Sequence, residues 1–275
     1  MKLALNTLGC PDWSLERLVS EAKRLGCSGI EIRGIQNEMD PDNIPWFSEE
    51  GAPRFNSFME CSGITPICLG SSVSLHDQDT LCKSLAEAKK YIRIANRCRI
   101  PSVRVFGNNV NNEENEKETL DRVSFSIREL CRYSEINTSL NGRPVQILLE
   151  AHGDFNILSR LYYVAEKVDR SSFGIIWDIA HVDRAHGDEF HEFYTTLRDY
   201  IRHLHIKDHK RTDNGFVLTS VGNGDIPIKE IVNTLASDGF DGYLSLETEK
   251  KWHPELPDPE NEFPHFVEYI RSLTE

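Results

Sequence analysis

The sequence lacks a long hydrophobic run and a recognisable leader segment. No uninterrupted apolar stretch approaches the roughly 20 residues that cross a bilayer, so we expect no transmembrane helix. The first residues lead directly into a strand-like run, without the apolar core and small-residue cleavage site of a signal peptide. We therefore expect a cytoplasmic protein that does not act at a membrane.

Closely spaced cysteines and an excess of positive charge are also missing. The seven cysteines are an odd number, lie far apart and form no Cys-x-x-Cys pair, which is typical of reduced, packed thiols. The formal net charge is −13, and no cluster of Lys and Arg with interleaved aromatic residues interrupts the acidic background. Because this charge would repel a phosphate backbone, we expect no nucleic-acid partner.

Short apolar runs alternate regularly with longer amphipathic segments over the whole sequence, which predicts parallel strands joined by helices. The length of 275 residues fits one complete eight-stranded α/β barrel. The predicted strands cover residues 3–6, 29–33, 65–69, 102–106, 145–150, 173–178, 201–207 and 242–247. The predicted helices cover residues 14–25, 53–62, 77–99, 114–135, 156–168, a segment after Asp188, 228–237 and 262–273, and residues 209–224 are expected to be a polar loop.

This pattern predicts a single (β/α)8 TIM barrel domain over residues 1–275. An open doubly wound sheet also uses such repeats, but six strands usually suffice there, and no Gly-x-Gly-x-x-Gly turn follows any predicted strand. No linker or low-complexity segment divides the chain, so we expect no second domain.

Four consecutive predicted strands carry a metal-ligand type of residue at their carboxyl ends, where barrel enzymes place their active sites. These residues are Glu150, Asp178, His205 and Glu247. Each alone could be a solvated or helix-capping residue, but their period-two parity directs all four into one mouth. Crowded carboxylates are costly to bury without a cation. The oxygen-rich set favours Mn²⁺, with Zn²⁺, Co²⁺, Fe²⁺ or Mg²⁺ as alternatives.

Several motifs carry a family resemblance that covers nearly the whole chain. They are Leu-Glu-Ala-His at 149–152, Trp-Asp-Ile-Ala-His at 177–181, His-Leu-His-Ile-Lys-Asp at 203–208, Gly-Asn-Gly-Asp-Ile at 222–226 and Ser-Leu-Glu at 245–247. In this order they resemble the xylose isomerase-like barrels, in the sugar phosphate isomerase/epimerase group that contains ketose epimerases, hydroxypyruvate isomerases and inosose dehydratases. The resemblance implies that the same four strand-end residues bind one divalent metal.

The resemblance also implies substrate-binding residues. His181 matches the histidine that follows the strand-six aspartate, and Arg211 stands six residues after His205, where ketose epimerases place a substrate-binding arginine. His152 is a further candidate beside the mouth. Glu31 and Arg33 share one face of the second strand and could pair with each other, while Arg33, Lys207 and Arg211 are candidates for a substrate phosphate. We expect His186, His191 and His209 on the surface.

These expectations predict a metal-dependent isomerase or epimerase of a small sugar, ketose or sugar-derived substrate. The metal would stabilise an enediolate, while Glu150 and Glu247 act as the two bases. An inosose dehydratase-type lyase using the same site is the alternative, followed by a non-catalytic sugar-binding barrel. The related apurinic endonucleases need extra histidines that this sequence lacks after strands three and four. A carbohydrate is the expected partner, and a homo-oligomer is compatible with the sequence.

Overall fold

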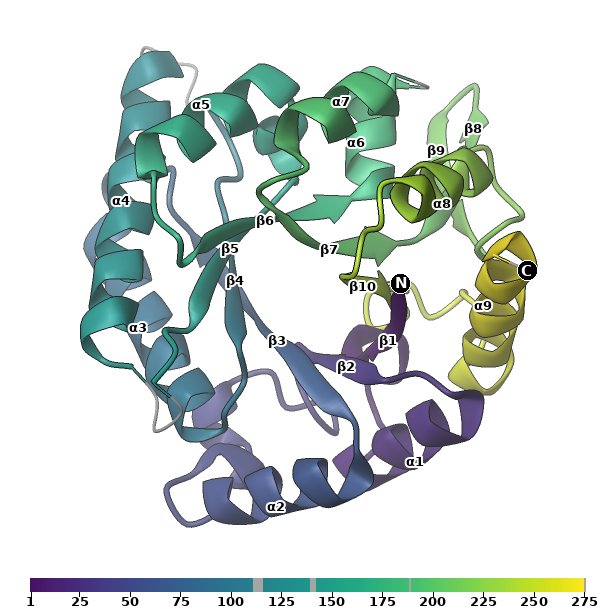
Figure 1. Ribbon diagram of the computed structural model, residues 1–275, viewed down its shortest axis with the longest axis horizontal. Helices are drawn as coiled ribbons and strands as arrows, with labels where there is room; N and C mark the ends of the chain where they lie inside the picture. The colour runs from purple at the N-terminus through teal and green to yellow at the C-terminus, as the bar shows by residue number, and fades with distance from the viewer. Residues whose placement is uncertain (111–115, 139–141, 188, 275) are drawn as a thin grey trace.

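The computed structural model describes residues 1–110, 116–138, 142–187 and 189–274, and its centre is a closed barrel of parallel strands in the order β1-β10-β7-β6-β5-β4-β3-β2 (Figure 1). The predicted TIM barrel is confirmed. The barrel strands are β1 Lys2–Asn6, β2 Gly29–Ile32, β3 Thr65–Ser74, β4 Ser102–Phe106, β5 Gln146–Glu150, β6 Phe173–Asp178, β7 Ile201–Ile206 and β10 Tyr243–Leu246.

Helices surround this barrel on its outer side (Figure 1). They are α1 Leu15–Leu25, α2 Ala52–Ser62, α3 Leu81–Arg97, α4 Glu116–Ile136, α5 Leu158–Val168, α6 Ile179–His186, α7 Phe190–Leu197, α8 Ile228–Ser237 and α9 Pro259–Thr274. The predicted start at Glu114 lies outside the described part of the chain, whereas the helix predicted after Asp188 is confirmed by α7. Strand six is followed by two helices, α6 and α7, where one had been predicted.

Helix α1 shows why the local sequence adopts this structure. The Ser14 side chain accepts a hydrogen bond from the backbone N–H of Arg17, which satisfies one of the free donors at the helix start. Gly26 ends the helix with a φ of 71°, a left-handed conformation that glycine adopts without a Cβ clash. The buried face of α1, formed by Leu15, Leu18 and Val19 with their neighbours, then packs toward the barrel.

Apolar side chains close the floor of the barrel beneath the strand ends. Leu148 and Ile176 lie two residues before Glu150 and Asp178, so each pair points to the same side of its strand. A separate buried cluster contains Ala4, Ile67, Cys68, Leu148 and Ile176. Among the helices described, none is both long enough and apolar enough to cross a membrane.

The segment predicted as a polar loop after β7 instead contains a hairpin, and this part of the prediction is wrong. Strands β8 Asp208–Thr212 and β9 Gly215–Thr219 pair antiparallel across a two-residue turn. Asp208 anchors the base of the hairpin, because its carboxylate accepts the backbone N–H groups of His209, Gly222, Gly224 and Ile226 at 2.9–3.3 Å.

Candidate metal centre and active site

The four predicted ligands converge at the carboxyl end of the barrel. Each of the residues Glu150, Asp178, His205 and Glu247 is at most 3% exposed, and they offer ligand atoms that all lie within 4.8 Å of one another. The His205 Nδ1 atom lies 3.1 Å from a Glu247 oxygen, 3.7 Å from Glu150 and 3.8 Å from Asp178. The strand register supports this arrangement, since Asp178 is the direct neighbour of His205.

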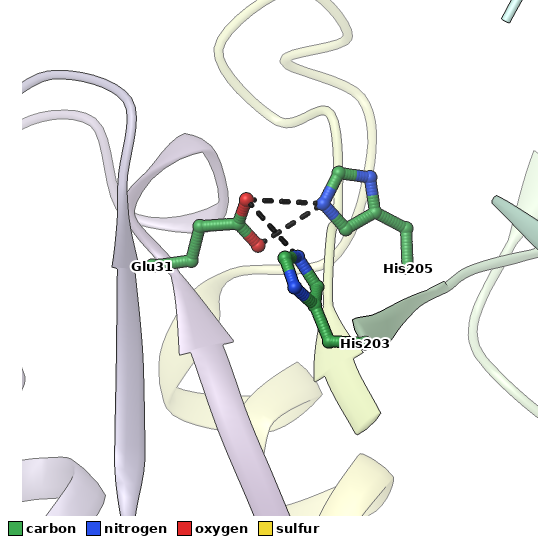
Figure 2. A group of neighbouring side chains, drawn as sticks. All are labelled: Glu31, His203 and His205. Carbon is green, nitrogen blue, oxygen red and sulfur yellow. Dashed lines mark hydrogen bonds and ion pairs between the residues drawn. The ribbon is translucent and has the colours of Figure 1, made fainter. Parts of the chain in front are cut away.

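The second ring nitrogen of His205, Nε2, lies against the carboxylate of Glu31 (Figure 2). Glu31 belongs to β2, which is separated from the His205 strand β7 by β1 and β10. Both Glu31 oxygens lie 3.0–3.1 Å from His205 Nε2, and Ser245 donates its hydroxyl to one of them at 2.9 Å. His203 Nε2 lies 3.6 Å from Glu31. The sequence had suggested a pair between Glu31 and Arg33, but Arg33 instead donates to the Ser72 hydroxyl.

Glu31 thereby determines which nitrogen of His205 faces the other three carboxylates. With Nε2 directed at Glu31, Nδ1 is the nitrogen left for a metal. Burial alone would raise the pKa of Glu31, but His205 and His203 hold it well below its ordinary value. Burial would lower the pKa of His205, yet Glu247, Glu31 and Glu150 raise it well above that of a free histidine.

Arg104 of β4 bridges the two candidate bases, and its role was missed from the sequence. Its Nη1 donates to Glu150 at 2.9 Å and to Glu247 at 3.1 Å, while Nη2 donates to the backbone carbonyl of Ser71. Burial would raise the pKa of Glu150, but Arg104 lowers it below its ordinary value. The signal in the sequence was one arginine between Val103 and Val105 in an otherwise apolar strand.

Lys207 supplies a second buried cation. Its Nζ lies 2.8 Å from Asp178, 2.8 Å from Glu247 and 2.8 Å from Glu249, which is partly exposed at the mouth. Although burial opposes its charge, these acidic neighbours raise the pKa of Lys207 well above its ordinary value. For Asp178 burial acts upward, but Lys207 and the nearby histidines hold its pKa well below normal.

The donor set fits a divalent ion. Asp178 uses one oxygen to accept the N–H groups of Ala180 and His181 at 3.0 Å, and so caps helix α6. Its second oxygen lies 2.8 Å from Lys207 Nζ and His205 Nδ1 lies 3.1 Å from Glu247, but neither buried atom makes a hydrogen bond of good geometry within the described part of the structure. Both atoms face the centre of the ligand group, where a cation would complete their environment.

A cavity of about 240 Å³ opens directly above these ligands. His152 and His181 line it, with ring centroids 4.3 Å apart, and Phe106 lies 4.8 Å beyond His152. Burial lowers the pKa of His181, so that its imidazole is neutral near pH 7. Both predicted substrate-binding histidines therefore stand in the cavity beside Glu150 and Glu247.

Arg211 lies outside the group of residues that line this cavity. Its Nη2 pairs with Asp183 at 2.7 Å, and the residue lies on β8 close to the turn of the β8–β9 hairpin. His209 shares the same carboxylate, with Nε2 2.9 Å from Asp183, and is fully buried. The prediction that His209 lies on the surface is wrong, because Asp183 provides a polar partner inside the protein.

Comparisons with known proteins agree with this architecture. A family model described as a xylose isomerase-like TIM barrel matches residues 19–273, whereas a comparison with curated proteins found no match. The probable 3-DHS dehydratase AsbF from Bacillus anthracis is similar in structure, with a TM-score of 0.76, 17% identity and coverage of 100% of this chain and 99% of that chain.

Two further solved structures are similar over their whole lengths. D-psicose 3-epimerase from Clostridium cellulolyticum H10 has a TM-score of 0.73 and 18% identity, with 100% of both chains covered. The IolI protein, solved with a bound zinc atom, has a TM-score of 0.75 and 17% identity, with 100% of this chain and 96% of that chain covered. At these identities the similarity establishes the fold alone.

Proposed function

Because this chain belongs to the xylose isomerase-like TIM barrel family, we propose that it is a divalent-metal-dependent isomerase or epimerase of a small sugar-derived substrate. Glu150, Asp178, Glu247 and the Nδ1 atom of His205 would hold the ion. Three carboxylate oxygens and one imidazole nitrogen suit Mn²⁺ best, with Zn²⁺, Co²⁺ or Mg²⁺ as alternatives.

The balance of buried charge at the mouth carries this proposal. The centre contains four buried carboxylates, which are Glu31, Glu150, Asp178 and Glu247. Among the described residues, Arg104 and Lys207 are the permanent cations buried with them, so two negative charges are left at this centre. A divalent cation would neutralise both, which supports a metal site over a network of ion pairs.

Glu150 and Glu247 are the proposed acid and base. A bound divalent ion would polarise the substrate carbonyl and make the neighbouring C–H more acidic. One carboxylate then removes that proton, and the other returns a proton to the same or the adjacent carbon. Arg104 contacts both carboxylates and fixes their orientation, and it favours the ionised form of the one that removes the proton. The carboxylate that returns a proton would first take it up from solvent at the cavity.

The cavity histidines are the proposed substrate contacts. The His152 and His181 rings face the cavity, where their nitrogens can hydrogen-bond substrate hydroxyl groups. Arg211 stays a prediction, since its pairing with Asp183 gives it a second role in holding the hairpin. A substrate long enough to pass the cavity rim would be needed to reach it.

A dehydratase is the second candidate, because the same proton removal can be followed by loss of a hydroxyl group. The pair of imidazoles beside the bases favours it, since an imidazole could hydrogen-bond the departing hydroxyl while the carboxylate that took up the carbon-bound proton passes a proton to it, releasing water. The two reactions give different products from one substrate. An isomerase conserves the mass of the substrate, whereas a dehydratase releases water.

Deuterium exchange from heavy water tests the proposed function directly. Protein loaded with Mn²⁺ is incubated with a panel of ketoses, inososes and hydroxypyruvate, and mass spectrometry follows deuterium incorporation and loss of water. We expect metal-dependent exchange into at least one compound, abolished by a chelator and restored by Mn²⁺. Absence of exchange across the panel, together with no stoichiometric binding of Mn²⁺ or Zn²⁺, would contradict the proposal and favour a non-catalytic binding protein.

A further inference from the structure

Arg33 lies at the edge of the cavity beside Arg104. It is the first residue after β2, three positions after Ile30 of the barrel wall. Its side chain lines the same cavity of about 240 Å³. A Cβ atom added to Gly70 would lie 3.1 Å from Arg33 Cδ and 3.5 Å from Arg104 Nη2. The missing side chain at Gly70 thus leaves room for two arginine side chains to lie next to each other on one wall.

The two guanidinium groups differ in how their donors are used. Arg104 donates hydrogen bonds from Nη1 to Glu150 and Glu247 and from Nη2 to the backbone carbonyl of Ser71. Arg33 has one hydrogen bond, from Nη2 to the Ser72 hydroxyl, and its buried Nη1 has no partner within the described part of the chain. No carboxylate forms an ion pair with Arg33 in that part of the structure either, so a buried cationic donor is left for a ligand.

Charge balance indicates what this ligand is. Once a divalent ion occupies the centre, its two charges together with Arg104 and Lys207 equal the charge of the four buried carboxylates. Glu249, partly exposed at the mouth, pairs with Lys207 at 2.8 Å, whereas Arg33 at the cavity wall has no acidic partner in direct contact among the described residues. Burial and the neighbouring Arg104 both disfavour the charge of Arg33, and an anion next to the guanidinium would relieve the cost.

We infer that the substrate carries an anionic group, a carboxylate or a phosphate, and that Arg33 binds this group with Ser72 beside it. The inference rests on the proposed function, because it assigns a substrate class to the same cavity. Arg33 Nη1 donates to one oxygen of the anion, while the reacting carbon lies deeper, between Glu150 and Glu247. A sugar acid or a sugar phosphate fits this description, whereas a neutral ketose leaves Arg33 without a partner.

Matched substrates test the inference. The Mn²⁺-loaded protein is given D-fructose, the related uronate D-fructuronate and D-fructose 6-phosphate, and the deuterium exchange rate is measured as kcat/KM. We expect at least one anionic compound to exchange 10-fold or more faster than D-fructose. Arg33→Met should remove most of this preference through KM, and Arg33→Lys should restore part of it, while the exposed Arg128→Met on α4 serves as the matched control.

The carboxylate and phosphate arms identify the anion. Exchange into D-fructose at an equal or higher rate than into both anions, unaltered by Arg33→Met, would overturn the inference while leaving the proposed function intact. If no sugar exchanges, the proposed function fails, and titration calorimetry with acetate and inorganic phosphate at constant ionic strength still tests Arg33. Binding that weakens 10-fold or more in Arg33→Met supports the anion site, whereas equal binding to both proteins overturns it.

Discussion

Two buried acidic clusters lie a short distance apart along the chain and are satisfied in different ways. At the base of the β8–β9 hairpin, the Asp208 carboxylate accepts four backbone N–H groups, and Asp183 pairs with His209 and Arg211. At the barrel mouth, acidic groups outnumber permanent cations, and buried atoms of Asp178 and His205 make no hydrogen bond of good geometry in the described structure. A cluster that is complete by itself holds the fold, whereas an incomplete one is prepared for a ligand.

The largest expected difference between the clusters is in turnover. Glu150→Gln and Glu247→Gln should each lower deuterium exchange by about 10²- to 10⁴-fold, because the amide cannot accept the substrate proton. Both variants should still fold, as judged by circular dichroism. Asp208→Asn is the matched control from the hairpin cluster and should keep exchange within a few-fold of the wild type. Wild-type exchange in either Glu→Gln variant would refute the scheme with two bases.

Added metal should stabilise the folded protein through the mouth cluster and not through the hairpin cluster. With Mn²⁺ at one hundred times its dissociation constant, binding adds about 2.7 kcal/mol to the free energy of unfolding. For a chain of this size that corresponds to a rise in Tm of roughly 5–10 °C, measured by differential scanning fluorimetry against chelated protein. The rise should persist in Asp208→Asn and disappear in Asp178→Asn. An equal rise in both variants would place the ion elsewhere.

Glu31 offers a finer test, because it acts on the metal through His205. Glu31→Gln should weaken Mn²⁺ binding by about 10- to 100-fold, as measured by calorimetry, since the histidine loses its anionic partner. Glu31→Asp, which keeps the charge, should recover part of the affinity. With Co²⁺ in place of Mn²⁺, the absorption spectrum of the bound ion should shift in Glu31→Gln. Unchanged affinity and an unchanged spectrum would mean that Glu31 does not influence the metal through His205.

Acid should affect the two clusters in opposite directions, and this is the smallest effect expected. His205 and Lys207 depress the pKa of Glu247, and Lys207 depresses that of Asp178, so their stabilisation is complete above the ordinary carboxyl pKa near 4 and is lost as pH falls through the lowered values. Burial raises the pKa of Asp208, whose contribution is instead lost as pH rises.

Urea unfolding of the chelated protein at pH 7 and pH 3 measures this difference. The fall in the free energy of unfolding between the two pH values should be smaller in Asp178→Asn than in the wild type. Asp208→Asn should not reduce it. A fall of the same size in the wild type and in Asp178→Asn would show that the mouth carboxylates do not control acid stability.

The barrel and the convergence of the four candidate ligands could be predicted because each depends on local patterns. Alternating segments specify the strands, and a carboxylate that ends an apolar strand, such as Glu150 in Gln146–Glu150, stands out from its neighbours. The helix Ile228–Ser237 is confirmed residue for residue. Parity along single strands was enough to direct these groups into one mouth.

The partners of those ligands could not be predicted in the same way. Glu31 meets His205 across 174 positions of sequence, and this contact depends on how far each strand is staggered when the barrel closes. Arg104 faces Glu247 for the same reason. The hairpin did have a local signal in the turn before Gly215, but its polar and charged side chains suggested a loop.

The seam between β1 and β10 has a consequence for how the protein matures. The last strand brings Glu247 to the ligand group, and its pairing with β1 closes the ring. A growing chain thus contains Glu150, Asp178 and His205 well before it can enclose a cation. If the centre binds a metal as proposed, selection of the ion would be deferred until the ring is complete, and the metals available in the compartment where the ring closes would decide which ion is bound.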